Sequence, residues 1–307
     1  MSFVLCVGPN PALQRTLWFP ELRLGEVNRA RHRIVSGGGK GTNVARVLGQ
    51  LGQRARLLTF VGGAVGDELV QILAREGIDA EVVRTASPTR VCITLIEEGV
   101  PRQTEVVEEA EPLTEEDVCA FREAFVRLLP EASMVVISGT CPPGTPESFY
   151  AELVSFAERA GLRVVVDAPG RLLLRAAESR PLLAKPNRKE LEAVFPGLPL
   201  EEQVHRLHEA GAENVFVTDG GHSAYLLTPD GGFRLYPPQV QPVNPIGSGD
   251  AAAAGIVFAL LQGKGMLDAV RFGVACGTAN TQTPLAGNVL PSDVERLFPL
   301  VRAEKWE

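Results

Sequence analysis

The sequence has few cysteines, and it lacks the spacing that would pair them. Five cysteines in 307 residues make an odd number, and no two of them form a C-x-x-C pair. They lie far apart, at Cys6, Cys92, Cys119, Cys141 and Cys276. This pattern excludes a disulfide framework and a cysteine-based zinc site, and it is typical of reduced thiols in a cytoplasmic protein.

Long hydrophobic runs and an excess of positive charge are also missing. The longest apolar run, 251–261, is too short to span a bilayer. The first residues, MSFVLCVGPN, lack a basic region, so we expect neither a signal peptide nor a membrane anchor. A net charge of -7 argues against nucleic-acid or anionic-membrane partners. Any anionic ligand must therefore meet locally placed cations.

Most of the chain alternates between short β-rich runs and amphipathic helical patterns. The predicted strands are 3–7, 56–61, 134–138, 162–167, 182–185 and 214–218. The predicted helices include 42–51, 67–76, 115–129, 146–160 and 201–210. Near-continuous apolar strands separated by helices predict a mostly parallel sheet covered on both faces, which is an α/β fold.

Two segments interrupt this alternation. Residues 17–34 and 89–109 interleave polar and apolar positions without a helix between them, which predicts antiparallel strands that are wet on one face. No linker or internal repeat stands out, so we expect one domain, 1–307, with a small β lid formed by about 12–35 and 88–110. A further hairpin is predicted to turn at Asp230 and Gly231.

A glycine-rich segment, SGGGKGTNVARVLGQLG, leads into the first predicted helix. Glycines let the main chain approach a ligand closely, and Lys40 adds a positive charge for a phosphate. The spacing does not fit a Walker A loop, because Gly41 stands where Ser or Thr is needed. A flexible turn before a helix is the alternative interpretation.

Two later segments also have two interpretations each. In KPNRKEL, Asn187 and Glu190 have the spacing of a capping box, and they could also orient a hydrated Mg²⁺ beside nucleotide phosphates. The segment VTDGGHSA, at 217–224, is either a nucleotide-contacting loop or a plain turn.

The stretch NPIGSGDAAAAGIVFALLQG begins a helix that is apolar on all sides. Such a helix is buried, so its first N–H groups need a partner. Asp250 could cap them. Alternatively, the loop of Gly247 and Gly249 could bind an anion while Asp250 takes a proton from an attacking hydroxyl.

Taken together and in this order, these segments resemble the PfkB branch of the ribokinase-like sugar kinases, nearly from end to end. FVGGAVGDEL and ISGTCPPG are similar to further family landmarks. The resemblance implies a ribokinase-like three-layer sandwich with a β-sheet lid that forms a homodimer interface. It also implies an enzyme, a phosphotransferase that uses ATP and Mg²⁺.

The resemblance also assigns roles to residues. Asp250 would be the catalytic base, beside the main-chain groups of Gly247, Ser248 and Gly249. The nucleotide site would contain Lys185, Asn187, Thr218, Gly220 and Asn280. The substrate site would contain Gln14, Gly38, Gly39, Lys40, Asn43, Arg90 and Ser138, with Lys40 and Arg90 near the substrate's own phosphate. Asn187 and Glu190 would hold the metal through water.

The implied acceptor is a ketohexose phosphate, first of all fructose 1-phosphate, which would become fructose 1,6-bisphosphate. Tagatose-6-phosphate kinase and 6-phosphofructokinase are alternatives. Gln14 stands where this branch usually has Asp, so one charge-assisted bond to a sugar hydroxyl is lost. A non-catalytic sugar-phosphate sensor is the alternative from another class. A kinase for unphosphorylated sugars or nucleosides conflicts with Lys40 and Arg90.

Overall fold

The computed structural model describes residues 2–100 and 103–306. Residues 1, 101, 102 and 307, which the predicted domain and lid ranges include, lie outside the described residues.

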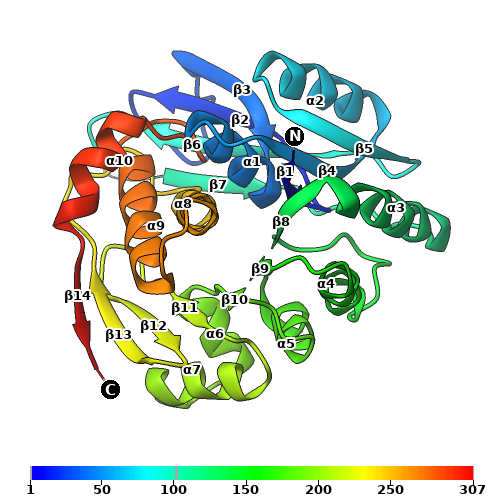
Figure 1. Cartoon of the computed structure of the whole chain (residues 1–307). Helices are drawn as coiled ribbons and strands as arrows, with labels where there is room; N and C mark the ends of the chain where they lie inside the picture. Colours follow the sequence, from blue (N-terminus) through cyan, green and yellow to red (C-terminus); the bar gives the residue numbers. More distant parts are fainter. Residues whose placement is uncertain (1, 101–102, 307) are drawn as a thin grey trace.

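A ten-stranded sheet forms the centre of the protein (Figure 1). Its order is β14-β13-β12-β11-β10-β9-β8-β1-β4-β5. The strands are β1 Phe3–Val7, β4 Ala55–Gly62, β5 Asp79–Thr85, β8 Ala132–Ser138, β9 Val164–Asp167, β10 Leu183–Ala184, β11 Val215–Val217, β12 Ala224–Thr228, β13 Gly231–Tyr236 and β14 Arg302–Lys305. All neighbours from β5 to β11 are parallel, and β12, β13 and β14 extend the sheet in antiparallel pairs.

Helices cover both faces of this sheet. One layer contains α3 Glu115–Leu128, α4 Phe149–Arg159, α5 Gly170–Glu178, α6 Arg188–Val194 and α7 Leu200–Glu209. The other contains α1 Lys40–Gln50, α2 Gly63–Arg75, α8 Ser248–Leu261, α9 Met266–Thr281 and α10 Pro291–Leu297. Short 3-10 turns, Leu129–Glu131 and Phe298–Leu300, follow α3 and α10.

Two apolar cores result, because successive strand side chains point to opposite faces. On β1, Phe3, Leu5 and Val7 belong to the core with α3 and α4, whereas Val4 and Cys6 belong to the core with α1 and α8. The predicted covering of both faces is confirmed. Helix α8 contacts α1 and α9, and most of its residues are buried, as its apolar sequence predicts.

A separate four-stranded sheet, the lid, is built from β2 Ala12–Phe19, β3 His32–Gly38, β6 Arg90–Glu97 and β7 Gln103–Val107. Its order is β3-β2-β6-β7. The prediction of purely antiparallel strands is wrong at the centre of the lid, where β2 and β6 pair in parallel. Each hairpin is antiparallel by itself, and the two hairpins join side by side through strands that run the same way.

All carboxyl ends of the parallel strands lie at the same edge of the main sheet, among them those of β1, β8, β9, β10 and β11. The lid is joined to this edge because β1 leads into lid strand β2, and lid strand β3 leads into α1. Ligands of open parallel sheets bind at this edge. Within the described part of the chain, no helix has the length and apolar character needed to cross a membrane.

Candidate active site

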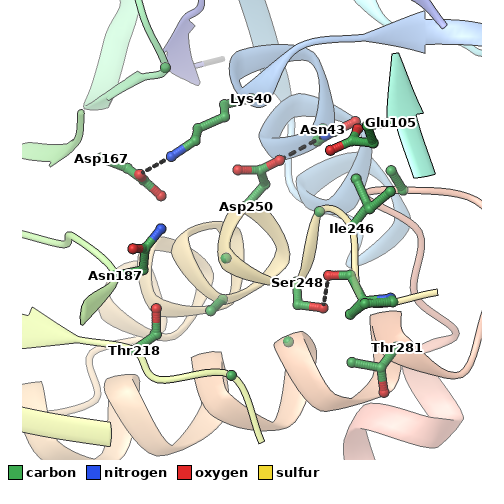
Figure 2. Close-up of a pocket in the computed structure, with 18 of the residues that line it drawn as sticks. Lys40, Asn43, Glu105, Asp167, Asn187, Thr218, Ile246, Ser248, Asp250 and Thr281 are labelled. Carbon is green, nitrogen blue, oxygen red and sulfur yellow. Dashed lines mark hydrogen bonds and ion pairs between the residues drawn. The ribbon is translucent and has the colours of Figure 1, made fainter. Parts of the chain in front are cut away.

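A cavity of about 930 Å³ lies between the lid and the carboxyl ends of the parallel strands. Residues at the carboxyl ends of strands line it: Gly139, Lys185 and Thr218 directly follow β8, β10 and β11, and Asn10 lies three residues after β1. Lid residues line one end, and the start of α8 lies in the middle (Figure 2). We call the lid side the acceptor end and the side near Thr218 the nucleotide end, after the ligands that the sequence resemblance implies for them.

The start of α8 has no side-chain cap. Its N-cap is Gly247, whose φ of 82° lies in the left-handed region that favours glycine. A side chain at this position would place its Cβ 2.4 Å from the nitrogen of Gly287. Among the described residues, the main-chain N–H groups of Gly249 and Asp250 have no hydrogen-bond acceptor. This helix start therefore presents unpaired donors and the positive end of its dipole to the cavity.

Asp250 itself does not cap these groups. Its carboxylate accepts a hydrogen bond from Asn43 Nδ2 at 2.7 Å, and the residue is only 5% exposed. Asn43 is held in turn by Arg46, whose Nη1 donates to its Oδ1 at 2.9 Å. Burial raises the pKa of Asp250 to about 6, against the opposing pull of the Lys40 ammonium. The carboxylate is thus fixed, desolvated and more basic than an exposed aspartate, as a general base requires.

Two lysines share one buried carboxylate at the end of β9. Asp167, 1% exposed, accepts from Lys40 Nζ at 2.8 Å and pairs with Lys185 Nζ at 2.6 Å. Burial alone would raise the pKa of Asp167, but the ammonium groups of Lys185 and Lys40 outweigh it and lower the pKa to about 2. The sequence interpretation missed Asp167, although it directly ends a predicted strand.

Lys40, predicted to lie near the substrate's own phosphate, lines the cavity and is paired with two carboxylates. Its Nζ contacts Asp167 (Figure 2) and also lies 3.1 Å from Glu190 Oε1. Burial would lower the pKa of Lys40, but Asp167, Asp250 and Glu190 together raise it above its ordinary value. The charged amine therefore stands among carboxylates in the middle of the cavity.

Asn187 and Glu190 form the predicted capping box at the start of α6. Asn187 Oδ1 accepts from the Glu190 N–H, and Glu190 Oε2 accepts from the Asn187 N–H, both at 2.9 Å. Within the described residues, no group of three His, Cys, Asp or Glu could hold a metal alone. Mg²⁺ keeps most of its waters and takes one or two carboxylates beside phosphates. Glu190 and Asp167, which both contact Lys40, fit such a hydrated ion.

At the nucleotide end, Lys185, Thr218 and Gly220 line the cavity as predicted. Asn280 does not. It is fully buried, donates from Nδ2 to Ile246 O at 2.9 Å and to Ser248 Oγ at 3.2 Å, and accepts from the Asn288 N–H. Its amide therefore holds the loop before α8 from the side that faces away from the cavity. The spacing of residues along the sequence does not reveal this supporting role.

At the acceptor end, the predicted residues Gln14, Gly38, Gly39, Asn43 and Arg90 line the cavity. Ser138 does not, because it is the last residue of β8 and is buried, and its hydroxyl has no partner among the described residues. Cavity-lining residues that the sequence interpretation missed are Cys92, Glu105, Glu109 and Thr140. The period of two along β6 and β7 could have identified Cys92 and Glu105, once the facing side of the lid was known.

Comparisons with known proteins identify the family and the fold. Residues 1–293 match the pfkB family carbohydrate kinases. Phosphofructokinase-2 from Escherichia coli, in a crystal structure with potassium, is 27% identical with a TM-score of 0.89 over 98% of this chain and 99% of that chain. A "possible 1-phosphofructokinase" from Thermotoga maritima is 28% identical with a TM-score of 0.90 over 99% and 100% of the chains. Ribokinase from Arabidopsis thaliana, with ribose and ATP, is 19% identical with a TM-score of 0.73 over 97% and 98%, which supports the ribokinase-like fold alone.

Proposed function

Because the chain belongs to the pfkB family of carbohydrate kinases, we propose that it transfers the γ-phosphoryl group of ATP to a hydroxyl group of a hexose-type sugar. The observation that carries this proposal is the start of α8. There a buried, basic carboxylate and two unpaired N–H groups lie between the acceptor end and the nucleotide end of one cavity.

In the proposed reaction, Asp250 accepts the proton of the acceptor hydroxyl as its oxygen attacks the γ-phosphorus. The new oxygen–phosphorus bond forms while the bond to the β–γ bridging oxygen breaks, and its electron pair leaves with ADP. The N–H groups of Gly249 and Asp250 would stabilise the charge on the transferring phosphoryl group, as preorganised donors do in phosphoryl transfer.

The proposed ATP site uses Lys185, Thr218 and Gly220. When bound, Mg²⁺ would neutralise phosphate charge, and Glu190 with Asp167 would hold it through water, with Asn187 orienting Glu190. The Lys40 ammonium contacts the carboxylates of Asp167 and Glu190, and it would face the γ-phosphate from the side of these two residues.

The similarity to phosphofructokinases supports a phosphorylated ketohexose as the acceptor, with fructose 1-phosphate first and tagatose 6-phosphate and fructose 6-phosphate as alternatives. Arg90 supports this choice, because it lines the acceptor end.

The predicted homodimer through the lid remains a proposal. Exposed apolar side chains on lid segments support it, namely Leu24, Val27, Ile34 and Val106. Light scattering at micromolar concentration would test it.

An assay that couples ADP release to NADH oxidation tests the kinase reaction. It should use phosphorylated ketohexoses and their unphosphorylated forms as acceptors under saturating MgATP. We expect turnover that depends on both the sugar and Mg²⁺. Sugar binding without turnover of any acceptor would instead support the non-catalytic sensor.

A further inference from the structure

An ion pair between Arg46 of α1 and Glu76 lies behind the wall of the cavity. Arg46 is only 7% exposed. Its Nη2 and Nε both donate to Glu76 Oε2, at 2.7 Å and 3.2 Å. Neither side chain is among the described residues that line the cavity. Any part that this pair plays in the reaction must therefore act through other residues.

The position of Glu76 is unfavourable for the helix that it ends. It directly follows α2, where it is the C-cap residue. The carboxyl end of a helix carries partial negative charge, so a carboxylate there is disfavoured. The reason for an acidic side chain at this position therefore lies outside α2.

The first contact outside α2 is with the lid. Strand β3 is the outer strand of the lid, and no described strand pairs with its free edge. At that edge the Gly37 N–H donates to Glu76 Oε1 at 3.0 Å, and the Gly37 carbonyl accepts from Arg46 Nη2 at 2.5 Å. The two side chains thus satisfy both main-chain groups of Gly37, as a neighbouring strand would.

The second contact is with the residue that holds the candidate base. Arg46 Nη1 donates to Asn43 Oδ1 at 2.9 Å and to the Ala286 carbonyl at 3.2 Å. Together with its bonds to Glu76 and Gly37, Arg46 uses all five of its N–H donors. A planar guanidinium engaged at every donor has a single orientation.

The Ala286 carbonyl belongs to a segment that also supports the start of α8. A Cβ added at Gly287 would lie 2.5 Å from Asn43 Cβ, and one added at Gly247 would lie 2.4 Å from the Gly287 nitrogen. Residues 286 and 287 are therefore packed between Asn43 and the N-cap of α8. Arg46 contacts the lid, the support of Asp250 and the support of the anion-binding turn at the same time.

The orientation of the Asn43 amide depends on this arrangement. An amide has one accepting and one donating side, and Arg46 occupies the accepting side. Asn43 Nδ2 is thereby directed to the Asp250 carboxylate, 2.7 Å away (Figure 2). If Arg46 were free to move, the amide could turn over and present its oxygen to the carboxylate, which would repel it.

We infer that Glu76 is a positioning residue for the reaction. It anchors Arg46, which fixes the Asn43 amide against Asp250 and holds the lid edge at the same point. This inference rests on the proposed kinase reaction and extends its machinery to a residue outside the cavity.

The first test is a double-mutant cycle on kcat with Glu76→Gln, Arg46→Met and the double variant. The amide of Glu76→Gln has one acceptor oxygen, so it cannot serve Gly37 and Arg46 together. We expect kcat to fall about tenfold while the KM for ATP stays unchanged. In the Arg46→Met background, Glu76→Gln should lower kcat by less than about twofold, because Arg46 is already absent.

Two further variants serve as controls. Glu152→Gln makes the same charge change in an ion pair that also joins two helices, 2.7 Å from Arg122 and away from the cavity, so it should keep the wild-type kcat. Glu76→Asp keeps the charge and both acceptor oxygens on a shorter side chain, so it should retain more of kcat than Glu76→Gln. It also carries the test if Glu76→Gln does not fold.

The second test needs no turnover. The difference in free energy of unfolding between a protein and its Asp250→Asn derivative, measured by urea titration at several pH values, reports proton binding by Asp250. The Asn43 hydrogen bond lowers the pKa of Asp250, so its loss in Glu76→Gln should move this titration to higher pH. Loss of the Glu76 charge acting only through space would move it to lower pH, so the direction distinguishes the two explanations.

The inference is overturned if folded Glu76→Gln keeps kcat within about twofold of wild type and titrates at the same pH. A loss of about tenfold that is equal with and without Arg46 also overturns it, because Glu76 would then act by another route. If the titration moves to higher pH but no variant and no wild type turns over any acceptor, the kinase reaction fails while the role of Glu76 stands.

Discussion

Replacing Asp250 by Asn should make the protein more stable and nearly inactive at the same time. The substitution keeps the shape of the side chain and an oxygen that can accept from Asn43. It removes a charge that burial disfavours, because the pKa of Asp250 is raised from 3.8 to about 6. At about 1.36 kcal/mol per pKa unit, the ionised carboxylate costs the folded state about 3 kcal/mol.

The sign of the pH dependence follows from proton binding. Between pH 3.8 and about 6, the folded protein binds more protons at this position than the unfolded chain does. The wild-type free energy of unfolding should therefore fall as the pH rises through this interval, relative to the variant. Below it, both side chains are neutral and the two proteins should have similar stability. Above it, Asp250→Asn should be more stable by up to about 3 kcal/mol.

Activity should change in the opposite direction. A general base contributes about 10²- to 10⁴-fold, so Asp250→Asn should lower kcat by about 100-fold or more. In wild type, kcat/KM should fall about tenfold per pH unit below about pH 6, because only the ionised carboxylate accepts the proton.

Two measurements together test this reasoning. Urea titration at several pH values gives the free energies of unfolding, and the coupled ADP assay gives kcat and its pH profile. Asp230→Asn, in the exposed hairpin turn, is the control and should change neither. A variant that keeps wild-type turnover, or one that is destabilised at pH 8, would refute the assignment of Asp250 as a buried base.

Three further substitutions test the residues that hold the site side chains and the start of α8 in position. Asp167→Asn leaves the buried Lys185 without its counter-charge, so urea titration should show a loss of about 3–5 kcal/mol, and a loss below 1 kcal/mol would contradict this pairing. Arg46→Met removes the donor that fixes the Asn43 side chain, so kcat should fall about tenfold while the KM for ATP stays constant. An unchanged kcat would show that Asn43 keeps its orientation without Arg46. Gly247→Ala forces a Cβ within 2.4 Å of a main-chain nitrogen at φ 82°, so melting should show about 2 kcal/mol or more of destabilisation, and a wild-type melting temperature would disprove the strain.

The sequence was sufficient to predict six of the seven parallel strands of the main sheet and five of its helices, but it missed the parallel strand β5. The predicted strand 3–7 matches β1, and the other predicted strands overlap β4, β8, β9, β10 and β11. These strands are continuous apolar runs, and their burial on both faces produces that pattern. The parallel pairing of β2 with β6 could not be predicted, because partner choice between two wet hairpins depends on tertiary contacts.

Site residues could be predicted where a polar residue stands out in its local sequence. They could not be predicted where packing alone determines whether a side chain faces the cavity. Asp250, after two glycines and before an apolar helix, stood out from its neighbours. Asn280 and Ser138 did not line the cavity, because a single turn of a helix or one step of a strand decides which way a side chain faces. The ion pairs of Lys40 depend on Asp167, which is distant in sequence.

The junction between the lid and α1 also limits how the lid can move. Strand β3 ends at Gly38 and α1 begins at Lys40, so a single peptide unit around Gly39 joins a sheet that covers the cavity to the helix that carries Lys40 and Asn43. With a φ of 99°, Gly39 is the natural pivot. Because this joint is a single residue long, any tilt of the lid would also turn the first residues of α1, and with them Lys40 and the Asn43 amide that binds Asp250.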